Sequence, residues 1–455
     1  MRNAERATLV LACLAVVLIQ ALVAGINLAI PQLAGSTLHP SGSQLVWIVD
    51  TYVIVFAALL IPAGALGDRW GRKGALLSGL VLFAVANVVS AYAGSVLVLQ
   101  AGRGLAGAAA ALAQPATLSL LLHVTSPQRR AHAIALWTTA MGMGGLVGNL
   151  VAGSVLRWFD WPALFLVFVP VTIAVAAGVA VLVPKAPRHP ANADPVGTLL
   201  LTAGLFALLF GIIEGPGHGW GSSEVLIGFA AGAVLLGAFA GFETTTAKPL
   251  LDPRVFWIGS VRAGTLGVAA GFFALFGLFY VNAQFLQEVK GYSTLVTGVA
   301  ITPLAVGMGV IAPRTVALAE RLGARTMVAA GLGTIVAGLL LLSTATAHTP
   351  YAIYAVYLFV MAVGMGACAP ALTGGILAGL PAGAAGLGSG LNSAAREVGA
   401  ALGIATIGTI LNAHTDFVAG LAVGYRSLAV ILAVLAVAVV AMWQPAAKLP
   451  QPAGV

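Results

Sequence analysis

The chain has 455 residues, of which 60% are hydrophobic and only 7% are charged. Soluble domains carry about 25% charged residues, so this composition excludes a water-soluble globular protein. The net charge of +8 would suit a nucleic-acid-binding protein, but no basic patch with interleaved aromatic residues accompanies it. We therefore expect no nucleic-acid partner.

Long apolar blocks follow one another along the chain. Each is about 20 residues long, the length of an α-helix that crosses a lipid bilayer. The blocks are apolar on all sides, whereas membrane strands alternate polar and apolar residues over about 10 residues. We predict an all-α polytopic membrane protein with fourteen transmembrane helices, near residues 9–30, 45–66, 74–93, 96–121, 131–155, 161–183, 196–215, 223–243, 260–286, 295–316, 326–346, 351–376, 389–412 and 425–444.

The 21 Lys and Arg residues predict the orientation of these helices. With the N-terminus inside, sixteen of them fall in cytoplasmic segments and three in outer loops or outer helix ends. The remaining two, Arg103 and Arg396, lie inside helices. This asymmetry follows the positive-inside rule, so we expect both termini in the cytoplasm.

An internal repeat predicts the domain organisation. The loop "ALGDRWGRK" (65–73) recurs as "ALAERLGAR" (317–325), 252 residues later, with Ala, Leu, an acid, Arg, Gly and a terminal base in register. Repeated halves of this kind place a substrate site between them near the bilayer midplane and allow alternating access. We predict an N-terminal six-helix bundle (1–184), a linker with two inserted helices (185–259) and a C-terminal six-helix bundle with a short tail (260–455).

Several motifs carry a resemblance to a known family. "GALGDRWGRKGAL" (64–76) resembles the signature loop of the major facilitator superfamily. "LQAGRGLAGAAAA" (99–111), "GMGGLVGNLVAG" (142–153) and "GLNSAAREVGAALG" (390–403) are similar to motifs of its fourteen-helix drug:proton antiporter branch. The resemblance implies a major-facilitator-type fold and proton-driven export of drugs or metabolites.

The chain departs from the pattern of this branch at three places. The first helix usually carries an aspartate nine residues before a proline, but here that position is Leu22, with only Gln20 nearby. Ala106 stands where the fourth-helix motif usually has glutamine, and Gly148-Asn149 where the fifth-helix motif usually has Gly-Pro. These changes bear on the proton-coupling arrangement rather than on the fold.

The signature loop is the predicted gating element. Its glycines, Gly64 and Gly71, allow a tight turn and close helix approach, and its bases Arg69, Arg72 and Lys73 suit the anionic inner face of the membrane. By resemblance, the thirteenth helix begins near Asp68. Since an acid is stabilised at a helix N-terminus, we hypothesise that Asp68 latches the inner gate; the alternative is a loop that only anchors topology.

Three carboxylates are candidates for proton coupling: Glu397, Asp50 and Glu214. Asp50 lies in the outer part of the second helix, where it could pair with Arg103 of the fourth and replace the missing first-helix acid. The competing reading of Asp50 is a residue of the membrane interface, beside Trp47 and Tyr52. Glu214 closes the seventh helix near the outer surface, where a solvated carboxylate needs no function.

The thirteenth helix carries the most unusual charges. Arg396 and Glu397 are adjacent, so they should point about 100° apart and fail to face each other. A charge without a partner at the centre of the bilayer costs roughly 2.5–3.5 kcal/mol on insertion scales, so we expect each residue to have its own partner or to face a water-filled cavity. Asn392 shares the stripe of Arg396; with Arg103, Asn149 and Gln20, these residues are the substrate and cavity candidates.

Together with the resemblance, these residues predict a proton-coupled secondary active exporter of amphipathic drugs or metabolites, which works by alternating access in the inner membrane of a bacterium. Its partners would be a small-molecule substrate, protons and the lipid bilayer, and we expect a functional monomer. No phosphate-binding GxxxxGK[ST] sequence is present, no metal-ligand spacing is found, and we expect neither a cofactor nor enzymatic activity. Two alternatives stay open: a dedicated exporter of one endogenous metabolite or lipid with weak or no proton coupling, and a non-transporting receptor or sensor.

Overall fold

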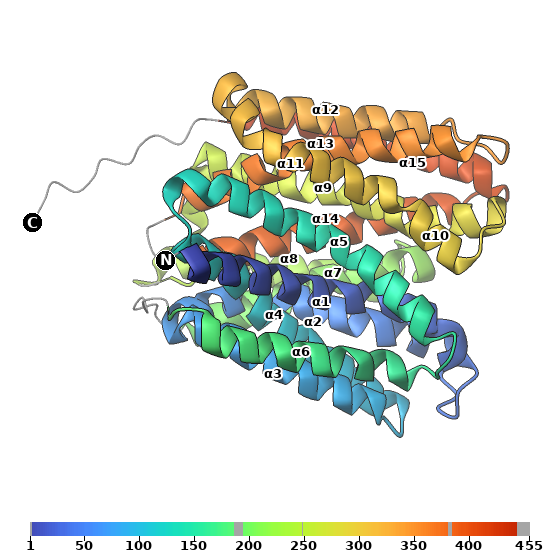
Figure 1. The fold of residues 1–455 in the computed structure, drawn as a ribbon, viewed down its shortest axis with the longest axis horizontal. Coiled ribbons are helices and arrows are strands. Elements are labelled where there is room, and N and C mark those ends of the chain that lie inside the picture. Colours follow the sequence, from blue (N-terminus) through green and yellow to red (C-terminus); the bar gives the residue numbers. More distant parts are fainter. Residues whose placement is uncertain (1, 186–193, 248, 381–384, 444–455) are drawn as a thin grey trace, which may run out of the picture.

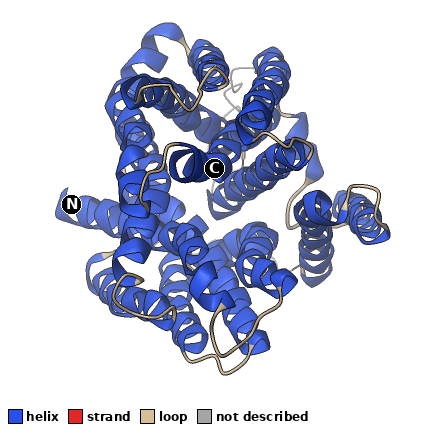
Figure 2. Ribbon diagram, turned by 90° about the vertical axis from the view of Figure 1, so that its right-hand side faces the viewer, coloured by secondary structure: helices blue, strands red, loops and turns tan. Residues whose placement is uncertain are grey.

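The computed structural model describes residues 2–185, 194–247, 249–380 and 385–443. Within these ranges the chain consists of helices and loops, without strands (Figure 2). The helices are α1 (Arg2–Ala34), α2 (Gly42–Trp70), α3 (Arg72–Ala91), α4 (Val96–Val124), η1 (Pro127–Arg129), α5 (Arg130–Val155), α6 (Pro162–Leu182), α7 (Pro195–His218), α8 (Ser223–Thr245), η2 (Pro253–Trp257), α9 (Gly259–Gln284), η3 (Phe285–Val289), α10 (Thr294–Ala300), α11 (Thr302–Leu322), α12 (Ala324–Leu342), α13 (Tyr351–Ala378), α14 (Ala385–Asn412) and α15 (Phe417–Met442).

Thirteen of these helical segments are long and apolar enough to cross a membrane, and a shorter apolar segment, Val296–Ile311, lies between two of them. Together they match the fourteen predicted spans. The tenth span is broken at Ile301, where α10 ends and α11 begins, because Pro303 has no N–H with which to continue the helical ladder.

The helices pack as two groups with an added pair. Helices α1 to α6 pack mainly among themselves, as do α9 to α15, while α7 and α8 form an antiparallel pair. In Figure 1, α3 and α6 lie at one edge of the molecule and α12 and α13 at the opposite edge. The domain boundaries at 184/185 and 259/260 remain a prediction.

The two groups meet most closely where α2 crosses α14. A β-carbon added at Gly390 would lie 2.5 Å from the carbonyl oxygen of Leu60 and 3.0 Å from the Cα of Ile61. A similar addition at Gly64 would overlap the backbone of Gly386. Only glycine allows this approach, so the contact between the groups is encoded in two short glycine-containing stretches.

Candidate functional site

Arg396 and Glu397 form a buried ion pair within α14. Glu397 Oε1 accepts hydrogen bonds from Arg396 Nη2 at 2.6 Å and from Nε at 3.0 Å. Arg396 is fully buried and Glu397 is 6% exposed. Our prediction that these neighbours cannot face each other was therefore wrong. Both side chains are long enough to bend toward each other, and an unpaired charge in this interior would be costly.

Arg396 also contacts three other helices. In the amide orientation that satisfies both residues, Gln114 Oε1 of α4 accepts from Arg396 Nη2 at 2.7 Å and from Nη1 at 3.2 Å. Arg396 Nη1 lies 3.3 Å from Met141 Sδ of α5, and its Cζ lies 5.6 Å from the centre of the Phe272 ring of α9. The guanidinium thus connects α4 and α5 of the first group with α9 and α14 of the second.

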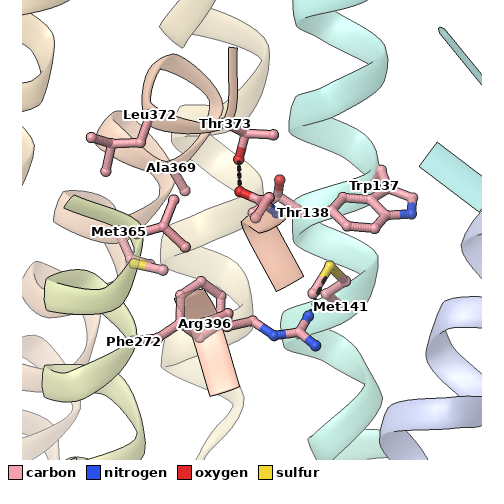
Figure 3. Close-up of a pocket in the computed structure, with 11 residues that line it drawn as sticks. Trp137, Thr138, Met141, Phe272, Met365, Ala369, Leu372, Thr373 and Arg396 are labelled. Atoms are coloured by element: carbon pink, nitrogen blue, oxygen red, sulfur yellow. Dashed lines mark hydrogen bonds between the residues drawn. The ribbon is translucent and has the colours of Figure 1, made fainter. Parts of the chain in front are cut away.

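A small pocket adjoins this guanidinium (Figure 3). Arg396 points toward Met141 across it, and Thr373 Oγ1 donates a hydrogen bond to Asn392 Oδ1 at 3.0 Å. The lining comes from α5, α9, α13 and α14, and it is mostly apolar: Trp137, Thr138, Met141, Val268, Phe272, Met365, Ala369, Leu372, Thr373, Asn392 and Arg396. Arg396 is eleven residues from the start of α14, roughly 16 Å along the helix. Two predicted cavity residues, Asn392 and Arg396, therefore lie together well inside the bundle.

Asp68 joins the end of α2 to the start of α14. Its Oδ2 accepts from the backbone N–H groups of Gly386 at 2.9 Å and Leu387 at 3.2 Å. Its Oδ1 accepts from Arg72 Nε at 2.9 Å, and Asp68 is 4% exposed. The predicted proximity of Asp68 to this helix N-terminus is present, and the arrangement satisfies orphan N–H groups with a negative charge. The gating role stays a hypothesis.

The remaining loop residues hold the turn itself. Gly71 has φ 105°, a conformation that side chains disfavour, and Lys73 Nζ donates to Val183 O at 2.6 Å at the end of α6. Arg69 is exposed. The second copy of the loop repeats part of this geometry, since Gly323 has φ 84° and Arg325 Nε donates to Val440 O of α15 at 3.1 Å.

Arg103 lies in a separate, fully buried position on α4. Its Nε donates to Ile48 O at 3.0 Å, and its Cζ lies 4.6 Å from the centre of the Tyr52 ring. Nη1 and Nη2 have no hydrogen-bond partner among the described residues. The predicted direct pair with Asp50 is therefore absent, because the Ile48 carbonyl and the Tyr52 ring hold the guanidinium instead. Asp50 is half-buried and close enough to interact with this charge.

Glu214 lies near the C-terminal end of α7, where it pairs with His218. Its Oε2 lies 2.6 Å from His218 Nδ1, and Glu224 lies 4.0 Å from His218 Nε2. The charge of Glu214 also acts on Asp50. These two proton-coupling candidates are thus near each other and outside the pocket that Arg396 lines.

The structure separates the other candidates from this pocket. Gln20 on α1 and Asn149 on α5 are half-buried, and neither lines it. The described residues include no group of three or more His, Cys, Asp or Glu side chains that could hold a metal ion.

Sequence reasoning missed Gln114, although a lone amide in the apolar run before Pro115 is a signal of a buried polar role.

Comparison with known proteins places the chain in a family. Residues 12–404 match the Major Facilitator Superfamily. The chain belongs to this superfamily.

Curated relatives cover most of the chain. The tetracenomycin C resistance and export protein of Streptomyces glaucescens is 33% identical over 380 residues, which are 82% of this chain and 70% of that protein. The multidrug efflux pump LfrA of Mycolicibacterium smegmatis is 32% identical over 86% of this chain and 79% of its own length. The methylenomycin A resistance protein of Streptomyces coelicolor is 32% identical over 89% and 86%.

Among solved structures, that of the human organic anion transporter MFSD10 (TETRAN) covers 96% of this chain and 99% of its own, with a TM-score of 0.68 and 16% identity. This likeness shows the fold. The protein is thus a polytopic major facilitator of the bacterial inner membrane, and the predicted all-helical major-facilitator fold and family resemblance are confirmed. The cytoplasmic location of both termini stays a prediction.

Proposed function

We propose that this major facilitator is a proton-coupled antiporter that exports amphipathic drugs or metabolites by alternating access. The observation that carries the proposal is the ion pair of Arg396 and Glu397, buried where helices of both groups meet. A buried carboxylate at such a junction can exchange its cationic partner for a proton.

Glu397 is the proposed proton carrier. With Glu397 ionised, its charge is balanced by Arg396 and the pocket is close to neutral. Protonation of Glu397 removes that balance, and the Arg396 guanidinium is then held by Gln114, Met141 and the Phe272 ring alone. Proton binding and release thereby change the charge presented to a substrate in the pocket, which is the requirement for coupling.

The proposed substrates follow from the pocket lining. Two methionines and two aromatic residues, Met141, Met365, Trp137 and Phe272, offer adaptable and stackable apolar surface, and Asn392 and Thr373 offer hydrogen bonds. This combination suits an amphipathic molecule. The printed names of the relatives, which include a multidrug efflux pump and a tetracenomycin C export protein, support drug or metabolite export.

The direction of export depends on the proposed orientation. Sixteen of 21 Lys and Arg residues in segments expected to be cytoplasmic support an inside location for both termini and for Asp68. We propose that the Asp68 contact with Gly386 and Leu387 closes the inner side, that Asp50 and Glu214 contribute to proton entry, and that the protein works as a monomer without enzymatic activity or a cofactor.

Transport by purified protein in liposomes with an imposed pH gradient tests the proposal. The wild-type chain should accumulate a fluorescent cationic dye against its gradient, and Glu397→Gln should abolish accumulation while dye binding persists. Glu288→Gln is the matched control, since Glu288 is an exposed glutamate near the end of η3. Gradient-driven accumulation by Glu397→Gln would remove Glu397 from the coupling mechanism.

The same assay separates the alternative of a dedicated exporter with weak or no coupling. That alternative is supported by the absence of an aspartate at Leu22 and by the single product in the name of the tetracenomycin relative. It predicts movement of one compound of a substrate panel at a rate that the pH gradient does not change. Proton-driven movement of several unrelated compounds would exclude it.

A further inference from the structure

Two carboxylates meet at one end of the inserted helix pair, away from the pocket. Asp194 is the N-cap of α7, and its Oδ1 accepts from Gly197 N at 2.7 Å. Glu243 lies in the last turn of α8, within hydrogen-bonding reach of Asp194. A β-carbon added at Gly197 would overlap both Asp194 Oδ2 and Glu243 Oε1. These two carboxylate oxygens therefore lie side by side against the backbone of Gly197.

Both carboxylates are buried without enough hydrogen-bond donors. Glu243 is 1% exposed and Asp194 is 7% exposed. Asp194 Oδ2 and both oxygens of Glu243 have no hydrogen-bond partner among the described residues. A buried polar group without a partner is costly, and a buried unpaired charge more so. The C-terminal end of a helix also disfavours a negative charge, so burial and the place of Glu243 in the last turn of α8 both oppose its ionised form.

The charged groups that the structure describes near the pair do not neutralise it. The segment packed against α8 carries Asp252 and Arg254, but Arg254 Nη2 donates to the backbone oxygen of Thr244 at 3.4 Å and Asp252 Oδ1 accepts from Arg254 N. In the described parts of the chain, neither Asp194 nor Glu243 forms an ion pair with a base. The backbone N–H groups of Leu250 and Leu251 also act on Glu243 as hydrogen-bond donors, outside normal hydrogen-bond geometry, and Asp194 Oδ2 keeps no donor among the described residues.

We propose that Asp194 and Glu243 form a proton-binding site in which one proton is shared between Asp194 Oδ2 and Glu243 Oε1. The proton supplies the donor that these oxygens lack and removes one of two adjacent negative charges. A metal ion would need further ligands, and no third acidic, histidine or cysteine side chain joins the pair in the described structure. The ligand of this site is therefore a proton.

The shared proton ties the start of α7 to the end of α8. Since α7 packs against both α2 and α14, the site sets how firmly the inserted pair is held on the bundle. It lies at the same end of the helices as Asp68, because α2 ends and α7 begins there. The site gives the inserted pair a response to pH on that side, whatever the transported substrate.

Thermal unfolding of the purified full-length protein in detergent between pH 5.5 and 8.5 tests the site. An unfolded chain has ionised carboxylates over this range, so a native state that retains one more proton loses up to tenfold in its folding equilibrium per pH unit as the pH rises. Glu243→Gln keeps a hydrogen-bond donor toward Asp194 without a titratable proton. It should remove this part of the pH dependence and also the infrared carbonyl band of a protonated carboxyl group.

Glu288→Gln is the control, since Glu288 is exposed near the end of η3, away from the inserted pair, and should change neither readout. If Glu243→Gln folds poorly, Asp194→Asn replaces it, because asparagine also caps a helix; it should likewise remove the pH dependence. An unchanged pH profile and an unchanged infrared band in both variants would overturn the proposal. So would stabilisation of the wild type by Na⁺ or Ca²⁺ at fixed pH that Glu243→Gln abolishes, since the ligand would then be a metal cation.

Discussion

The carboxylate of Asp68 accepts a hydrogen bond from the backbone N–H of Gly386 at 2.9 Å, across 318 positions of sequence. The contact joins the last turn of α2 to the first turn of α14, and these helices belong to different helix groups. One side chain therefore holds the two groups together at this end of the bundle, within a turn of the closest glycine contact between them.

Replacing Asp68 by asparagine should loosen this end of the molecule. Asn keeps the size and one acceptor but loses the charge, and charged hydrogen bonds contribute about 1–2 kcal/mol more than neutral ones. We expect the separated arrangement of α2 and α14 to become roughly 5- to 30-fold more populated. Ser389 is fully buried at this contact. The change is measured as the rate at which a Ser389→Cys variant reacts with a water-soluble thiol reagent. The native Cys13 and Cys368 are replaced by alanine in this variant, so that only the introduced thiol reacts.

Arg69→Gln serves as the comparison for Asp68→Asn, because Arg69 is the exposed neighbour in the same turn. Its variant should leave the thiol reaction rate unchanged. Equal reaction rates for the Asp68→Asn and wild-type backgrounds would rule out the latch.

Gly390→Ala should destabilise this arrangement of the helices by about 1–3 kcal/mol, the usual range for overpacking. Its β-carbon would lie 2.5 Å from Leu60 O, a backbone atom that cannot move without shifting α2. Gly374→Ala, on α13, meets no atom within 4 Å and should be neutral or slightly stabilising. The unfolding temperatures of the two variants provide the measurement, and equal values would mean that the α2–α14 approach is not tight.

Arg396→Met should cost more than the double replacement Arg396→Met/Glu397→Gln. The single variant leaves Glu397 buried without its partner, which typically costs roughly 3–5 kcal/mol, whereas removing both charges is often close to neutral. A double-mutant cycle on the free energy of unfolding gives the coupling. Additive losses would show that the pair contributes nothing as a pair.

Tyr52→Leu should be more destabilising than Tyr52→Phe. Phenylalanine loses only the long hydrogen bond from the hydroxyl to Ile19 O at 3.4 Å, worth at most about 1 kcal/mol. Leucine also removes the ring beneath the Arg103 guanidinium, which contributes about 2 kcal/mol when desolvated. Chemical unfolding of both variants distinguishes these losses; the same value for both would mean that the ring face does not stabilise Arg103.

Composition and helix-length blocks were enough to predict the helical membrane fold, because a bilayer leaves few ways to satisfy backbone polar groups. The position of Asp68 could also be predicted, since it depends on a local motif and a helix end. The partners of Arg396 and Arg103 could not. They depend on how long side chains bend in three dimensions, and Met141, Phe272 and Tyr52 are unremarkable in sequence. The Asp194–Glu243 contact was missed for a similar reason, because the two residues are 49 positions apart in helices of similar composition.

The inserted helix α7 makes the two long edges between the helix groups unequal. At the α2–α14 edge, Leu209 and Ile212 of α7 pack against both groups, and Trp220 Nε1 donates to Thr409 Oγ1 at 3.0 Å. At the α5–α11 edge, Met143, Val306 and Val310 are 40–47% exposed instead of being covered by the inserted pair. Relative movement of the groups at the first edge must break the contacts of α7 as well as those of α2 with α14, whereas at the second edge only the direct contacts of α5 with α10, α11 and α13 oppose it. The molecule therefore has one edge between the groups that the inserted pair reinforces and one that it leaves uncovered.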